Sequence, residues 1–183
     1  MSTVPTFQLR VTLLGSEPPI WRQLHVPATI TLEALHQVIQ ISMGWGDDHL
    51  HEFAAGTKRY GPAASPGGVR VHDERKALLY RVLTKPGQRM LYLYDFGDGW
   101  EHEVRVEAIL RPEQPPEFPV CTAGERACPP EDCGGIWGYD DLLEVLGNPE
   151  HEEYEERREW IGDDFDPEAF DLEAVNRRLR AIR

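Results

Sequence analysis

The sequence contains no long hydrophobic segment. No uninterrupted apolar run approaches the roughly 18 to 20 residues that a helix needs to cross a bilayer. The first residues, MSTVPTFQLRVTLLG, also lack the basic stretch and following apolar block of a secretory signal. We therefore expect no membrane association and a cytoplasmic location.

Cysteine is scarce as well. Three cysteines are too few for a disulfide framework, and a reducing compartment is the simplest setting for them. Cys121, Cys128 and Cys133 are separated by six and four residues, so the tight C-x-x-C pair of most zinc sites is absent. A zinc or other divalent metal site on these thiols needs a distant further ligand, such as His102. A pair of linked thiols and buried free thiols are the alternatives.

Basic residues are outnumbered by acidic ones. The chain has 19 Lys and Arg against 32 Asp and Glu, a net charge of −13, and no basic cluster reverses this charge locally. Because such a surface repels phosphate backbones, we expect no direct binding of nucleic acid. The charge is compatible with a basic partner, a metal cation, or no charged partner at all.

The chain does contain clear strand and helix patterns. Alternating apolar residues predict strands over residues 7–13 and 20–26, joined by a turn at GSEPP. Helical spacing follows over residues 31–43, with Thr31 as N-cap and Gly44 as the stop. Residues 49–56, which include His49 and His51, return to strand-like alternation.

The later chain divides into a sheet-rich and a helical part. The strongest strand patterns cover residues 89–96 and 100–110; a loop and a short helix are expected at 61–73 and 74–83. Helices are expected within residues 139–147, 149–161 and 171–182. We therefore predict an α+β fold, a mostly antiparallel sheet packed on a helix (ββα start) with a C-terminal helical segment. It forms a single domain over 1–183: a sheet-rich part 5–110, a Pro-rich connector 111–120, and a Cys loop with helices over 121–183.

The stretch YDFGDGWEHE, residues 94–103, divides the two strongest strands. A two-residue Asp98–Gly99 turn, which this dipeptide favours, pairs Leu93 with Val104 and Asp95 with His102. This register places aliphatic residues of both strands on one face and makes Asp95 and His102 a cross-strand pair. The pair either closes the rim of the core or orients His102 toward a ligand or metal.

Two further segments concentrate polar groups. His49 and His51 point to the same side of a strand and, with His102, can form a three-imidazole site if the segments are adjacent. The stretch PPEDCGG, residues 129–135, presents Glu131 and Asp132 either on a rigid connector or on a ligand-facing loop. We predict that this loop, the hairpin turn and the histidine segment line one depression.

These motifs, in this order and at these spacings, resemble the plasmid pRiA4b ORF-3-like family, some members of which are labelled passenger proteins of insertion elements. The resemblance covers about residues 5 to 180 and rests on TLEALHQVIQISMGW, HLHEF, YDFGDGWEHEV, CPPEDCGGIWGYDDLLEVL and FDPEAFDLEAVNRRL. It implies a single α+β domain without an established activity. The positions it marks as a shared surface are Trp45, His49, His51, Asp95, Asp98, Trp100, His102, Pro129, Pro130, Glu131, Asp132, Gly134 and Gly135.

Two functions compete at this point. Because no complete catalytic motif is present, the first is a non-enzymatic binding or interaction module with a polar pocket for a small molecule or protein. The second is a metal-dependent, hydrolase-like enzyme that uses His49, His51, His102 and nearby carboxylates, with zinc or another divalent ion as cofactor. The candidate ligand-binding residues are His49, His51, Asp95, Asp98, Trp100, His102, Glu131 and Asp132; the candidate metal ligands are Cys121, Cys128, Cys133 and His102.

Overall fold

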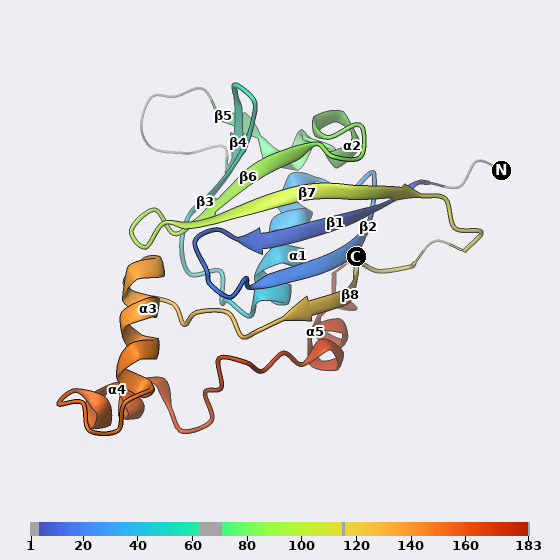
Figure 1. The fold of residues 1–183 in the computed structure, drawn as a ribbon. Coiled ribbons are helices and arrows are strands. Elements are labelled where there is room, and N and C mark those ends of the chain that lie inside the picture. The colour runs from blue at the N-terminus through green and yellow to red at the C-terminus, as the bar shows by residue number, and fades with distance from the viewer. Residues whose placement is uncertain (1–3, 63–70, 115, 183) are drawn as a thin grey trace.

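All strands of the described chain belong to one sheet (Figure 1). The computed structural model describes residues 4–62, 71–114 and 116–182. The sheet order is β5-β4-β3-β6-β7-β1-β2-β8, and every pair is antiparallel except β4 with β5. The predicted α+β class with a mostly antiparallel sheet is therefore confirmed. The strands are β1 (Thr6–Leu13), β2 (Trp21–Pro27), β3 (His51–Ala55), β4 (Lys58–Gly61), β5 (Val71–Asp73), β6 (Arg89–Tyr94), β7 (Trp100–Leu110) and β8 (Val120–Glu125).

Helices α1 and α5 begin where short polar side chains cap them. Thr31 Oγ1 accepts a hydrogen bond from Ala34 N at 3.1 Å, so the predicted Thr31 cap is confirmed. Asp171 Oδ1 accepts a hydrogen bond from Ala174 N at 2.8 Å and caps α5 in the same way. Among the described residues, no helix is long and apolar enough to cross a membrane. The helices are α1 (Leu32–Met43), α2 (Leu79–Val82), α3 (Gly135–Leu146), α4 (Tyr154–Ile161), α5 (Leu172–Leu179) and the short 3-10 helix η1 (Glu74–Lys76).

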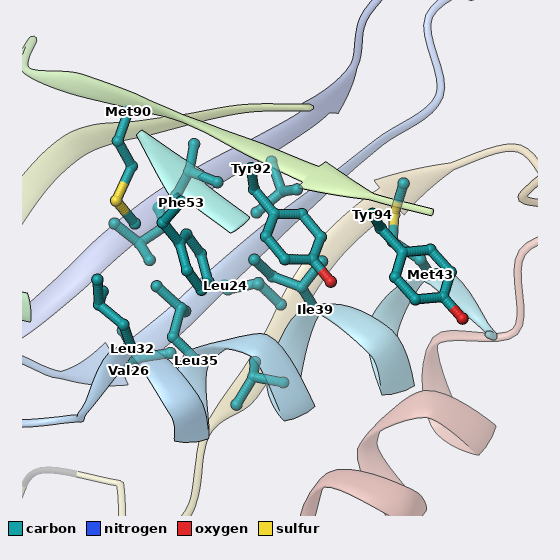
Figure 2. Close-up of a cluster of buried hydrophobic side chains, with 14 of the residues drawn as sticks. Leu24, Val26, Leu32, Leu35, Ile39, Met43, Phe53, Met90, Tyr92 and Tyr94 are labelled. Carbon is teal, nitrogen blue, oxygen red and sulfur yellow. The ribbon is translucent and has the colours of Figure 1, made fainter. Parts of the chain in front are cut away.

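Helix α1 supplies one wall of the hydrophobic core. Its residues Leu35 and Ile39 are fully buried, and Figure 2 shows them beneath Phe53 and Tyr92 of the sheet. The spacing of the buried helix positions matches the 3.6-residue period, while the strands bury alternate residues. The core is therefore built from helix residues with a 3.6-residue period and strand residues with a two-residue period.

Helix α5 is fixed to the edge strand β8 by one side chain. Asn176 Oδ1 accepts a hydrogen bond from Cys121 N at 2.9 Å, and Asn176 Nδ2 donates one to Cys121 O at 2.8 Å. Leu179 of the same helix is fully buried. The C-terminal helix is therefore held both by core burial and by two hydrogen bonds between the Asn176 side chain and the Cys121 backbone.

The boundary between the sheet-rich and helical parts differs from the prediction. Residues expected to open the cysteine loop form β8 instead, which pairs with β2 and buries Cys121. Helix α4 begins at Tyr154 rather than Pro149, because His151 Nδ1 accepts the hydrogen bond of Glu153 N and the preceding backbone makes turn bonds. Within the loop predicted at 61–73, residues 71–73 form β5, and residues 63–70 lie outside the described chain.

The predicted register of the β6–β7 hairpin is wrong. Tyr92, not Asp95, stands opposite His102, a difference of three residues. Because side chains alternate between faces, an odd shift turns β6 over, and Tyr92 and Tyr94 are buried where Leu91 and Leu93 were expected. The connection starts at Asp95, whose backbone oxygen accepts from Gly99 N at 2.7 Å and whose Oδ1 accepts from Gly97 N at 2.8 Å.

This arrangement predicts unequal costs for two leucine truncations. Leu35→Ala removes a fully buried side chain between α1 and the sheet, and should lower the free energy of unfolding by about 2–5 kcal/mol. Leu93→Ala changes a side chain that remains partly exposed, so its cost should be smaller. Urea unfolding of both variants measures the difference, and an equal or larger loss in Leu93→Ala would support the predicted register over the observed one.

Candidate functional site

A polar pocket of about 440 Å³ lies beside the first half of α1. Side chains from α1, from the loop that leads into β3, and from η1 form its walls. They are Glu33, His36, Gln37, Asp47, His49, Leu50, His51, Pro62, Glu74 and Arg75. The pocket thus contains both histidines of the predicted strand segment, together with a third histidine from α1.

Two histidines are stacked at the inner wall of this pocket. The rings of His36 and His51 are nearly parallel, at 6°, with centroids 3.4 Å apart. His36 Nε2 lies 2.7 Å from Asp47 Oδ1, and His51 Nε2 lies 2.8 Å from Glu74 Oε2. One potential ligand atom from each of His36, Asp47 and His51 falls within 4.8 Å of the other two. We call His36, Asp47, His51 and Glu74 the stacked-histidine cluster.

The helix and the sheet hold the stacked-histidine cluster in place. His36 Nδ1 lies 2.8 Å from the hydroxyl of Tyr92, which accepts a hydrogen bond from Gln40 Nε2 at 2.9 Å. Gln40 Oε1 accepts a hydrogen bond from the backbone N–H of Asp47 at 3.0 Å. The orientation of the His36 ring and the position of Asp47 therefore depend on the same buried pair, Gln40 and Tyr92.

The stacked-histidine cluster carries more negative than positive charge at neutral pH. Burial, together with the neighbouring His51, lowers the pKa of His36 to about 4, so this imidazole is neutral. It therefore leaves the Asp47 carboxylate without a counter-charge. Glu74 is only 4% exposed, and within the described ranges His51 is its only ion-pair partner. A buried carboxylate such as Glu74 is stabilised by a cation.

His49 lies between two other carboxylates. Its Nδ1 is 3.8 Å from Asp95 Oδ2, and its Nε2 is 3.4 Å from Asp132 Oδ1. The side chain is 28% exposed, and its ring packs edge-on against Tyr94. One ligand atom from each of His49, Asp95 and Asp132 lies within 4.8 Å of the others, which defines a second group that we call the His49 cluster.

Unusual backbone conformations coincide with these carboxylates. In the described part of the chain, four non-glycine residues have positive φ: Asp47 (65°), Asp95 (57°), Asp132 (59°) and Arg126. Asp is among the residues that tolerate this region best, yet it remains uncommon. Such conformations often accompany functional sites. Three of the four are carboxylates of the two histidine clusters.

The PPEDCGG loop lies against the same end of the sheet. Trp45 Nε1 donates to Pro129 O at 3.0 Å, and Gly134 N donates to Asp98 Oδ2 at 3.1 Å. The Tyr94 hydroxyl donates to Glu131, because burial and the Glu131 carboxylate raise the pKa of Tyr94 and keep it protonated. The loop, the hairpin turn and the histidine segment are therefore brought together.

His102 and Trp100 lie in the core instead. Both are fully buried, and neither lines the pocket. His102 Nδ1 lies 3.0 Å from Trp100 O, while its Nε2 has no hydrogen-bond partner among the described residues. Burial lowers the pKa of His102 to about 4, so the ring is neutral. The predicted Asp95–His102 pair is wrong, because Asp95 belongs to the turn and contacts His49.

The cysteines also stand apart from both clusters. All three are free, and neither group of potential metal ligands found in the described chain contains one. Burial raises the pKa of Cys121 to about 11 and that of Cys133 to about 12, and it raises the pKa of Cys128 as well. Because metals and electrophiles react with the thiolate, these environments disfavour cysteine chemistry.

Three members of the stacked-histidine cluster were not singled out in the sequence. His36 follows Leu35 on the apolar side of α1, Asp47 lies in a short polar loop, and Glu74 precedes two basic residues. The available signal was His36, a polar residue at a buried position four residues after Leu32 and three before Ile39. Asp47 and Glu74 gave no such signal, since surface carboxylates are frequent.

Close packing of Gly135 against the hairpin gives a matched test of the loop position. A Cβ at Gly135 would collide with the backbone oxygen of Asp98, whereas one at Gly99 would meet no atom within 4 Å. Their φ angles are +69° and +70°. Gly99→Ala should therefore cost only the conformational strain, about 1–2 kcal/mol. Gly135→Ala should cost about 1–3 kcal/mol more through overpacking, as measured by urea unfolding; equal losses would contradict this contact.

Burial of neutral His102 predicts a pH dependence of stability. Its pKa is about 4 in the folded state against 6.5 ordinarily, so the unfolded chain binds more protons between these values. Stability should therefore fall as the pH drops from 6.5 to 4, with His102 contributing on the order of 3 kcal/mol. In His102→Leu, unfolding free energies measured across this range should show a correspondingly weaker slope. Parallel curves for the two proteins would argue against a buried neutral ring.

Comparison with known proteins places this geometry in a family. The model described as plasmid pRiA4b ORF-3-like protein matches residues 5–174. The uncharacterized protein y4hQ of Sinorhizobium fredii (strain NBRC 101917 / NGR234) is 40% identical over 174 residues, 94% of this chain and 89% of that protein. A crystal structure of MM3350 from Methanosarcina mazei Go1, a protein of unknown function, is similar with a TM-score of 0.85 and 44% identity, covering 93% of this chain and 96% of that one. With a match over nearly its full length and relatives well above 30% identity, the chain belongs to the plasmid pRiA4b ORF-3-like family.

Proposed function

We propose that this protein is a metal-dependent binding protein. In this proposal His36, Asp47 and His51 hold one divalent transition-metal ion, and the ion in turn binds a small polar ligand in the pocket. The observation that carries it is the pair of stacked, buried imidazoles with their two carboxylates inside a pocket of about 440 Å³.

The donor set suits ions such as Zn²⁺. Imidazole nitrogen and carboxylate oxygen bind zinc and its neighbours in the first transition series. His36 is neutral at pH 7 because burial lowers its pKa to about 4, so a metal ion does not compete with an imidazolium proton there. A divalent cation also supplies the positive charge that Asp47 lacks beside a neutral His36.

Glu74 and Tyr92 have supporting roles in this proposal. A histidine that binds a metal usually directs its other ring nitrogen to a carboxylate or another fixed partner. Glu74 contacts His51 in this way, and the Tyr92 hydroxyl contacts His36 Nδ1. Three protein ligands leave a tetrahedral ion one position for a ligand, and the pocket volume falls in the range of small-molecule sites.

A metal-dependent, hydrolase-like enzyme is the second candidate. The specific observation in its favour is His49, which lines the same pocket and lies between Asp95 and Asp132. A histidine flanked by carboxylates can act as a general base toward a ligand held by the metal. His102 has no part in either candidate, because it is buried outside the pocket.

Metal analysis of protein purified without chelator tests the proposal. We expect about one equivalent of a transition metal per chain. After chelator treatment, competition titration with a chromophoric chelator should show that Glu74→Gln weakens Zn²⁺ binding by about 10–100-fold. Glu33→Gln is the matched control, because Glu33 lines the same pocket but is exposed and outside the cluster, so its affinity should equal that of the wild type.

Two outcomes would overturn the proposal: no metal bound by the wild-type protein, or an equal loss in Glu33→Gln and Glu74→Gln. The same preparations separate the binding protein from the enzyme. If the loaded protein hydrolyses chromogenic phosphate or carboxylic esters and His49→Gln abolishes turnover without releasing the metal, the enzyme is supported. Absence of turnover with metal bound supports the binding protein.

A further inference from the structure

Helix α4 is weakly supported by the rest of the molecule. None of its eight residues is buried, and five of them are charged. Figure 1 shows it beside α3, at the end of the molecule away from α5. Its tryptophan, Trp160, is 51% exposed. A helix with an exposed aromatic side chain and no fully buried residue is suited to contact with another molecule.

A groove separates α4 from the PPEDCGG loop. It has a volume of about 370 Å³ and is lined by Asp132, Cys133, Glu156, Arg157, Glu159 and Trp160. We call it the Trp160 groove. One wall is therefore an aromatic ring on a helix, and carboxylates come from both the helix and the loop.

The charge in the Trp160 groove is strongly unbalanced. Arg157 is already engaged, with its Nη2 3.0 Å from Glu153 and 3.4 Å from Asp141. Glu156 and Glu159, in contrast, form no ion pair with any residue in the described ranges. Around the groove, residues 135–168 contain 13 Asp and Glu but only two arginines, and the second, Arg158, pairs with Asp163 at 3.2 Å.

We propose that the Trp160 groove binds an arginine side chain of a basic protein partner. A guanidinium group stacks flat on an indole ring, and its N–H groups match carboxylate oxygens in a planar fork. Trp160 supplies the ring, and Glu156 and Glu159 supply the carboxylates. The groove accommodates one such side chain, while the acidic surroundings attract a segment with further basic residues.

Arginine fits these features better than lysine does. The lysine ammonium is compact and strongly hydrated, so it gains less from an aromatic face and lacks the planar fork with which a guanidinium pairs with a carboxylate. The net charge of −13 attracts both residue types at long range. We therefore expect the Trp160 groove to bind arginine more tightly than lysine, although both side chains carry one positive charge.

Fluorescence anisotropy with a labelled six-arginine peptide tests this proposal, using the full chain at 150 mM salt. Trp160→Leu should weaken binding by about tenfold, the effect of losing a partly desolvated cation–π contact. Glu156→Gln/Glu159→Gln should weaken it to a similar degree, and six-lysine should bind about tenfold more weakly than six-arginine. Because the double glutamine variant replaces only exposed side chains, it should fold even if the tryptophan variant does not.

Matched controls separate the groove from general charge attraction. Trp137→Leu removes an 86% exposed tryptophan that does not line the groove, and Glu144→Gln/Glu173→Gln removes two exposed charges elsewhere. Both should bind the peptide within twofold of the wild type. The proposal is overturned if these controls lose as much as the groove variants, if six-lysine or spermidine binds as tightly as six-arginine, or if the wild type does not bind. Metal-depleted protein should bind equally well, which keeps this test independent of the metal site.

Discussion

The burial of Trp45 connects the parts of this molecule that carry its unusual polar groups. Trp45 follows α1 directly and is 4% exposed, with its ring centroid 5.0 Å from that of Tyr94 and 5.2 Å from that of His102. Its indole N–H donates to the Pro129 backbone at 3.0 Å. One side chain thus joins the end of α1, the β6–β7 hairpin and the PPEDCGG loop. A large aromatic ring with a single polar group is well suited to that position, because it fills the core and satisfies one buried carbonyl.

The tyrosines of β6 link the hydrophobic core to the polar side chains of the candidate site. Tyr92 and Tyr94 present their rings to the core. The Tyr92 hydroxyl contacts His36 of the stacked-histidine cluster, and the Tyr94 hydroxyl donates to Glu131 of the PPEDCGG loop. Their burial raises both pKa values, so both hydroxyls keep their protons. Fixed hydroxyl groups at the edge of an aromatic core restrict how the nearby imidazole and carboxylate can move. Rigid support of this kind is what a binding site needs from its scaffold.

The sequence predicted the helices and strands better than it predicted the register between strands. Helix α1, its Thr31 cap and most strands follow from period and capping, which are local properties. The predicted hairpin register was wrong because Asp98–Gly99 resembled a two-residue turn. In the structure Gly97 N donates a hydrogen bond to Asp95 Oδ1, and the connection starts earlier, at Asp95. Because the prediction placed aliphatic residues of both strands on the core face, it assigned Leu91 and Leu93 to the core. The structure buries Tyr92 and Tyr94 there instead. Strand β8 was missed because its pairing with β2 is non-local and irregular.

The same distinction applies to the candidate site. The motifs containing His49, His51, Glu131 and Asp132 were recognisable because each concentrates polar residues with glycine or proline. From that concentration alone we predicted that these segments line one depression; the structure brings them together, but of these four residues only His49 and His51 line the pocket. His36 and Glu74 come from separate elements, and only the folded arrangement makes them neighbours of His51. His102 was overvalued, since a histidine beside acidic residues in sequence can face the opposite side of the strand in the fold.

The contact between Asn176 and Cys121 has a consequence for self-association. A free strand edge exposes unpaired N–H and C=O groups on which a strand of another chain can add. Asn176 occupies both of these groups at Cys121 and mimics a neighbouring strand at that point. A new strand could not continue along β8 past Cys121 unless α5 first moved away. The C-terminal helix therefore blocks addition of a further strand at this point of the β8 edge.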